Sequence, residues 1–128
     1  MARAKTVQSI VASVSNAADA TTRGAIDVRD KDGGIITLKF TNGATGPTVA
    51  CSARIMIAHD TGATPATGAA GVTWKTIKKF DHTTANDDIA EKEYQFGPAV
   101  MHVQVEFTGN TGQAVTVEAI ASTVNYSA

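Results

Sequence analysis

The triplet Asp60-Thr61-Gly62 is the clearest candidate for chemistry in this chain, and it follows the run Ile-Met-Ile-Ala-His at residues 55–59. An Asp-Thr-Gly-Ala sequence on a short β-rich chain suits a dimeric aspartic protease, in which two carboxylates share one proton and activate a water molecule. However, His59 stands where such an enzyme places an apolar residue, and no apolar-apolar-Gly segment follows. The Gly-Gly pair at 33–34 precedes the motif, whereas a flap over the dyad would follow it. We therefore expect a protein that is not an enzyme.

Histidine and carboxylate pairs offer a second chemistry, metal binding. They occur at residues 59–60 and 81–82, and His102 lies in a polar position of a later segment. Adjacent residues of a strand point to opposite faces, so each pair easily supplies only one ligand. The Asp-Lys-Asp-Gly at 30–33 begins like a calcium loop but lacks the later bidentate Glu, and a β-turn explains it. No metal and no cofactor is predicted.

Size, charge and cysteine content exclude several other classes. The chain has 128 residues, which suits a single domain over residues 1–128, and its formal net charge is −1. Cys51 is the only cysteine and lies in an apolar run, so it is expected to be a buried hydrophobe. Lysines at 75, 78 and 79 near Trp74 could contact single-stranded nucleic acid, but such a stripe is more often a solvated strand face. No membrane span or signal peptide is apparent, which indicates a cytoplasmic site of synthesis and no membrane partner.

The elements that must position these residues read as strands. Ala, Thr, Val and Gly are abundant and aromatic residues make up 5% of the chain, which favours β-structure. In residues 36–41 apolar and polar side chains alternate, and residues 48–58 alternate with both faces partly covered. Residues 72–80 form a further strand in which Ile77 is out of phase and predicts a bulge or a second buried face. A strand at 7–14 is also expected.

Two hairpins and one long loop are predicted between these elements. The strand at 24–29 should pair with that at 36–41 through the glycine turn at 30–34. Residues 99–107 and 113–122 should form the second hairpin, with His102, Gln104 and Glu106 on a polar outer face. The acidic segment 81–95 is expected to be a surface loop with one helical turn at 87–92. Residues 1–6 are expected to form a flexible N-terminal arm.

This pattern predicts an all-β fold, either an antiparallel β-sandwich or a jelly-roll-like barrel of about 6–8 strands with long surface loops. The loop DTGATPATGAAG at 60–71 is long for a compact domain, which suggests that another molecule orders it. The candidate partner-contact residues come from the arm, from this loop and from the acidic segment. They are Arg3, Lys5, Asp60, Thr61, Thr64, Pro65, Thr67, Asp87, Asp88 and Glu91.

Two longer stretches resemble the small β-proteins of tailed-bacteriophage virions, above all the capsid decoration or cement proteins. They are AHDTGATPATGAAGVTWKTIKKF and MHVQVEFTGNTGQAVTVEAIASTV, and the similarity extends over most of residues 24–124. The resemblance implies a structural protein on the capsid surface of the virion, assembled in the bacterial cytoplasm. Many copies would bind the major capsid protein, and neighbouring copies or a homo-oligomer would add avidity. It carries no site residue with it.

Two alternative functions stay open. A tail-tube or head-to-tail connector subunit would pair strands between neighbours and form rings. A carbohydrate-binding β-sandwich would need an aromatic platform, for which Trp74, Tyr94 and Phe96 are the candidates.

Overall fold

The computed structural model describes residues 2–67 and 73–127, which form strands, turns and loops. The strands are β1 Ala2–Asn16, β2 Thr22–Asp27, β3 Gly34–Asn42, β4 Ser52–Ala58, β5 Lys75–Asp81, β6 Ile89–Phe96, β7 His102–Thr108 and β8 Val115–Ser127. This described part contains no helix, and so none that could cross a membrane. The all-β prediction is confirmed.

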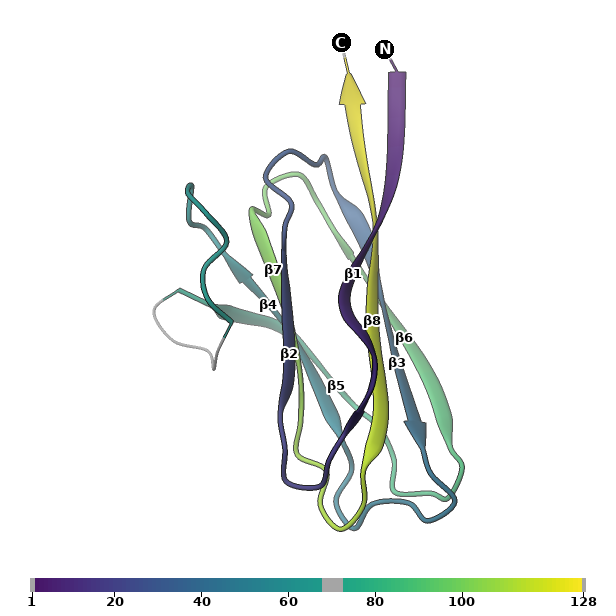
Figure 1. Cartoon of the computed structure of the whole chain (residues 1–128). Coiled ribbons are helices and arrows are strands. Elements are labelled where there is room, and N and C mark those ends of the chain that lie inside the picture. The colour runs from purple at the N-terminus through teal and green to yellow at the C-terminus, as the bar shows by residue number, and fades with distance from the viewer. Residues whose placement is uncertain (1, 68–72, 128) are drawn as a thin grey trace.

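The strands build two antiparallel sheets that pack face to face (Figure 1). Sheet A has the order β1-β8-β3-β6, and sheet B has the order β2-β7-β4-β5. The chain changes sheet at every connection except the one between β4 and β5. This alternation is the double-sheet architecture of a jelly roll, so the predicted fold class is confirmed.

One apolar core fills the space between the sheets. On β3, Ile36, Leu38 and Phe40 point inward and are fully buried, as their alternation with polar residues predicts. The ring of Phe40 meets that of Phe107 on β7 edge to face, with 5.5 Å between the ring centroids. Cys51 is fully buried in the same core, which confirms the prediction, and burial raises the pKa of its thiol to about 11. Both sheets therefore share a single set of core side chains.

Both predicted hairpins are wrong. β2 pairs with β7 in sheet B, whereas β3 pairs with β6 and β8 in sheet A. Likewise β7 and β8 lie in different sheets, so the connection 109–114 crosses the sandwich. Gly109 and Gly112 have φ angles of 95° and 82° in that connection, which only glycine adopts without strain. Glycine-rich turns mark the ends of strands, but they do not decide whether the next strand stays in the same sheet.

The acidic segment also differs from its prediction. Residues 89–96 form strand β6 at the edge of sheet A, so the helical turn at 87–92 is wrong and the loop shortens to 82–88. The inward positions of β6 include Ala90 and Lys92, which are only partly buried. Because these two inward residues are not large and apolar, the sequence of β6 lacks the apolar alternation that indicates a strand. The bulge predicted at Ile77 is confirmed, because the register between β4 and β5 shifts there.

The two ends of the chain form a two-stranded ribbon that projects from one end of the sandwich (Figure 1). β1 pairs with β8 from Ala2↔Ser127 onward. Residues 2–6, which the sequence suggested as an arm, therefore belong to a long strand, and Met1 lies outside the described residues. Lower on β1, β2 approaches so closely that a Cβ on Gly24 would meet the carbonyl oxygen of Ile10 at 1.8 Å.

Candidate contact surface

The connection between β4 and β5 folds back over the outer face of sheet B. Trp74 at its end is 3% exposed and packs with Met56 and Ala58 of β4 in a second apolar cluster. Ala25 of β2 borders this cluster. This connection covers part of the outer face of sheet B, and the β7 residues from His102 to Phe107 are buried on both faces. The polar outer face predicted for residues 99–107 is therefore wrong.

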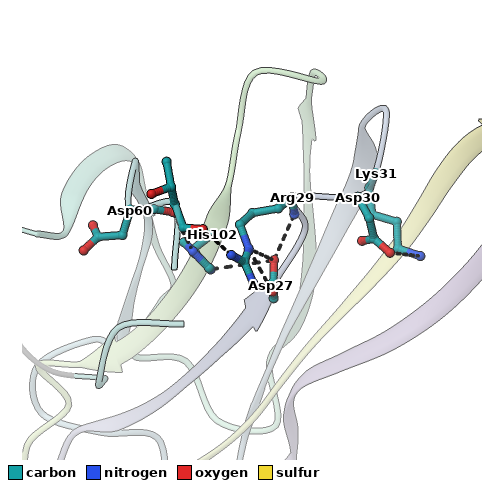
Figure 2. A network of polar contacts seen from close by, with 7 residues as sticks. Asp27, Arg29, Asp30, Lys31, Asp60 and His102 are labelled. Carbon is teal, nitrogen blue, oxygen red and sulfur yellow. Dashed lines mark hydrogen bonds and ion pairs between the residues drawn. The ribbon is translucent and has the colours of Figure 1, made fainter. Parts of the chain in front are cut away.

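Backbone carbonyl groups anchor this connection to the sheet. Figure 2 shows His102 of β7 beneath the loop, where its Nε2 lies 3.0 Å from the carbonyl oxygen of Asp60. The guanidinium of Arg29 donates to the carbonyl oxygen of Thr61. At the far side, the indole Nε1 of Trp74 donates to the carbonyl oxygen of Ala66 over 2.9 Å. The loop is held by its backbone, and its side chains at 59–64 are exposed.

Asp27 orients the guanidinium that holds the loop. Its carboxylate accepts from Arg29 Nε at 3.0 Å and from Arg29 Nη2 at 2.7 Å, a two-pronged geometry that fixes the plane of the guanidinium. The hydrogen bond from the Arg29 side chain lowers the pKa of Asp27 to about 2. The same contact raises the pKa of Arg29. Both groups are therefore charged throughout the physiological pH range.

His102 has one satisfied and one unsatisfied ring nitrogen. Because a carbonyl oxygen only accepts, Nε2 carries a proton and donates it to the carbonyl oxygen of Asp60. Nδ1 lies 3.9 Å from Asp27 Oδ1 and has no hydrogen-bond partner among the described residues. The arrangement positions the loop through its backbone carbonyl groups.

An ion pair with a buried carboxylate lies further along β7, also on the outer face of sheet B. Arg23 Nε of β2 donates to Glu106 Oε2 over 2.7 Å, and the side chain of Glu106 is 5% exposed. Arg54 of β4 is the residue opposite Glu106 on the other side. Two arginines thus flank the one carboxylate that sheet B buries.

The residues proposed for chemistry do not converge. The carboxylate of Asp60 points away from His102 toward solvent (Figure 2), and only its carbonyl group takes part in the network. His82 lies far from it, stacked on Phe40 with 5.0 Å between the ring centroids. Within residues 2–67 and 73–127, no group of three or more His, Cys, Asp or Glu side chains is placed to hold a metal ion.

The candidate contact residues fall at two ends of the molecule. Arg3 and Lys5 lie on the ribbon, and residues 60–67 lie in the same half of the sandwich (Figure 1). Asp87, Asp88 and Glu91 lie at the opposite end, where Asn42 Nδ2 ties down the loop 82–88 by donating to the carbonyl oxygens of residues 83 and 85. Residues 68–71 of the predicted loop, and Val72 of the predicted strand, lie outside the described residues. The ten candidates therefore form two separate surfaces.

The three aromatic residues considered for a carbohydrate platform also lie apart. Trp74 is buried over sheet B, whereas Phe96 is 9% exposed in the main core. Tyr94 packs against that core from β6. These rings do not form a shared exposed surface.

The anchoring residues Asp27, Arg29 and His102 were not singled out as a group by the sequence. They come from β2, from the turn after it and from β7, and only the pairing Asp27↔His102 brings two of them together. One signal was present, because His102 is a titratable residue in a strand where Val103, Val105 and Phe107 alternate with polar residues. Its cross-strand partner Asp27 could not be predicted without knowledge of the strand order.

Comparisons with known proteins show similarity at the level of the fold. No protein-family model matches the sequence, and no curated protein matches it. The K3 cleaved adhesin domain of Lys-gingipain from Porphyromonas gingivalis aligns with a TM-score of 0.59 at 11% identity, covering 86% of this chain and 72% of that domain. A chain of the T13 particle of infectious bursal disease virus aligns with a TM-score of 0.57 at 8% identity. That alignment covers 97% of this chain and 31% of the viral chain.

A carbohydrate-binding module of family 29 from Piromyces equi is similar to a lesser degree, with a TM-score of 0.50 at 10% identity. The alignment covers 93% of this chain and 91% of the module. Chains of a viral particle and one carbohydrate-binding module thus have folds similar to that of this chain.

Proposed function

We propose that this chain is a structural protein of a tailed-phage virion, a decoration protein that binds in many copies to the major capsid protein on the outside of the head. It would be assembled in the host cytoplasm and would stabilise the shell without catalysis. Each copy would add interface area between neighbouring capsid subunits. Many equivalent positions on a shell make even small interfaces effective when copies are linked.

The observation that carries this proposal is the way residues 59–67 are held. Three carbonyl groups of this loop are bound by side chains: that of Asp60 by His102, that of Thr61 by Arg29, and that of Ala66 by Trp74 at the end of the same connection. Its own side chains are mostly small or uncharged, and nearly all are exposed. A loop fixed in this way is preorganised for a protein partner, since little conformational entropy is lost when it binds.

The comparisons agree with this proposal without choosing it over others. A jelly roll is a common architecture of capsid subunits and also of sugar-binding domains. The likeness to the infectious bursal disease virus chain supports a virion role, and the likeness to the Piromyces equi module supports carbohydrate binding. The proposal therefore depends on the loop and on the residues quoted for the resemblance.

A sedimentation experiment tests the proposal directly. Undecorated heads of the phage whose genome encodes this chain are mixed with the purified protein, and bound copies are counted at saturation. We expect saturable binding at a fixed ratio to the major capsid protein. In the variant Thr64→Arg, binding should weaken at least tenfold, because a long charged side chain occupies the centre of the contact.

Gln113→Arg is the matched control, since it adds the same side chain to an exposed turn at the opposite end of the sandwich. It should bind like the unaltered protein. If the folded, unaltered protein does not bind expanded heads, the decoration role is excluded. Ring formation by the isolated protein would then favour a tail-tube or connector subunit, and saturable binding on a glycan array would favour a carbohydrate-binding module.

A further inference from the structure

Sheet A has two edges, and both carry strands with one unpaired side. β1 pairs only with β8, and β6 pairs only with β3, in the described part of the chain. Alternate backbone N–H and C=O groups of an edge strand point away from the sheet and can bind another strand. The outer half of β1, residues 2–9, keeps a regular register with β8, whereas register shifts follow at residues 9–14. The regular part is therefore the part suited to further pairing.

The two edges carry opposite charge on the same face. Successive pairs across sheet A place Val7, Ser122, Ile35 and Gln95 in one row, and these side chains are exposed. By the two-residue period of a strand, Arg3 and Lys5 share this outer face on β1. Glu91 and Glu93 share it on β6, and both are exposed. Residues 2–9 contain no acidic residue.

Exposed apolar side chains lie beside these charges. Val7 is 71% exposed and Ile89 is 59% exposed, which makes them the two most exposed large apolar side chains among the described residues. Val7 follows the two basic residues on β1, and Ile89 precedes the two acidic residues on β6. Along β1 these residues run basic, basic, apolar. Along β6 they run apolar, acidic, acidic, so the two edges are complementary when the strands are antiparallel.

We propose that β1 of one copy pairs antiparallel with β6 of a second copy and extends sheet A from molecule to molecule. One register satisfies all of these residues at once. Its outer-face pairs are Arg3 with Glu93, Lys5 with Glu91, and Val7 with Ile89. A shift of two residues in either direction leaves only one opposite-charge pair and separates the two apolar side chains. Opposite charges and apolar pairs directly across a sheet both stabilise pairing.

The strand directions agree with this arrangement. Within sheet A the strands alternate in direction, so β1 and β6 run antiparallel to each other. Two copies with the same orientation therefore present antiparallel edges. Val7 is level with Gln95 in its own sheet but would be level with Ile89 of the second copy, a difference of six residues. This corresponds to an offset of about 20 Å along the strands.

The resulting interface is head-to-tail, because each copy uses a different edge toward each neighbour. Such contacts propagate into an open assembly unless a rotation closes them into a ring. The ribbon suits the offset because it projects beyond the body of the sandwich (Figure 1). The inference does not depend on the proposed capsid role, since it concerns contacts between copies of this chain alone.

Two single-cysteine variants test the pairing. Val7→Cys and Ile89→Cys are prepared separately and then mixed under mildly oxidising conditions. Directly opposite residues of an antiparallel pair have Cα atoms about 4.5–5.5 Å apart, which suits a disulfide. We expect a disulfide-linked dimer in the mixture and much less in either variant alone. Cys51 does not compete because it is buried.

The register is tested by a third variant, Gln95→Cys, which lies on the same face of β6 but six residues away. Mixed with Val7→Cys, it should cross-link at least tenfold less than Ile89→Cys does. Cross-linking of Val7→Cys with itself would instead indicate a symmetric pairing of two β1 strands and would overturn the proposal. Absence of a cross-link in every mixture would also overturn it.

Charge reversal gives an independent test in solution. Sedimentation velocity of the unaltered protein should show association that increases with concentration. Lys5→Glu or Glu91→Lys should each weaken it about tenfold, because an opposite-charge pair becomes a like-charge pair. An equal mixture of the two variants should regain association, since each copy then meets a complementary neighbour. A protein that stays monomeric up to millimolar concentration, or a mixture that does not recover, contradicts the proposal.

Discussion

At the scale of single residues, Glu106 shows how a buried charge depends on its partner. Its side chain is 5% exposed on the outer face of sheet B, and Arg23 Nε lies 2.7 Å from its carboxylate. A carboxylate removed from water is tolerated when hydrogen bonds compensate for its lost hydration. Arg23 is thus needed to compensate the buried carboxylate of Glu106, although two apolar residues at these positions could give an equally stable fold.

Removal of one partner should therefore destabilise the fold more than removal of both. We expect Arg23→Met to lower the free energy of unfolding by about 2 kcal/mol, because Glu106 then stays buried without its strongest partner. The double variant Arg23→Met and Glu106→Met should recover part of this loss. Urea unfolding measures both. A double variant that is less stable than the single one would contradict this interpretation.

Asp27 makes stability depend on pH in the acidic range. Its carboxyl titrates near 3.8 when unfolded and near 2 when folded, because Arg29 donates hydrogen bonds to it. Between these values the unfolded chain binds more protons, so stability falls as pH decreases from about 4 to about 2. Asp81 contributes in the same direction, since the hydroxyl of Ser52 lowers its pKa.

The variant Asp27→Asn should remove part of this dependence. Its thermal midpoint, followed from pH 7 to pH 2, should fall less steeply below pH 4 than that of the unaltered protein. Above pH 5 the variant should be the less stable of the two, because it lacks the ion pair with Arg29. Parallel profiles over the whole range would show that the titration of Asp27 does not contribute to the pH dependence of stability.

At the scale of elements, alternation located strands well and pairings poorly. The inward residues of β3 were predicted because Ile36, Leu38 and Phe40 alternate with polar side chains. Alternation with a period of two residues does not indicate which strand lies next to a given strand. The sequence therefore predicts that β2 pairs with β3, whereas it pairs with β7. Edge strand β6 was missed because its exposed face is acidic and its inner face holds Ala90 and Lys92.

The candidate surface was also predictable only in part, because local patterns reveal a loop but not the residues of other elements that contact it. The loop beginning at Asp60 stood out by its length and composition, and the structure places residues 60–67 at the surface. The groups that anchor it, His102 and Arg29, belong to other elements, and their approach depends on the order of strands in sheet B. His102 is likewise buried beneath the connection between β4 and β5, and no local sequence pattern predicts that contact.

Trp74 should be the side chain that holds this cover in place. We expect Trp74→Ala to lower the free energy of unfolding by about 3–5 kcal/mol, because a large buried ring is lost. Trp74→Phe keeps an aromatic ring but loses the hydrogen bond to the carbonyl oxygen of Ala66, so it should be milder. Limited digestion with a protease of broad specificity should then cut residues 60–67 faster in the alanine variant. Equal cutting rates would show that Arg29 and His102 suffice to hold the loop.

At the scale of the whole molecule, one core joins two sheets whose outer surfaces differ. Sheet A is open at both edges and exposed on its outer face, whereas the connection between β4 and β5 covers part of the outer face of sheet B. The main core combines side chains from both sheets, among them Leu38 of β3 and Phe107 of β7. Because the main core is built from both sheets, whereas the cluster around Trp74 adds to it only on the outer face of sheet B, the two sheets should unfold together.

A substitution in sheet A should consequently also lower the stability of the outer face of sheet B. Leu38→Ala leaves a cavity in the shared core and should lower the free energy of unfolding by about 3 kcal/mol. Trp74 is the only tryptophan of the chain, so its fluorescence reports on the outer face of sheet B. Its urea transition should shift as far as that of the far-ultraviolet circular dichroism signal, which reports on both sheets. A fluorescence transition that keeps its midpoint while the dichroism transition shifts would mean that the cover and sheet B unfold independently of sheet A.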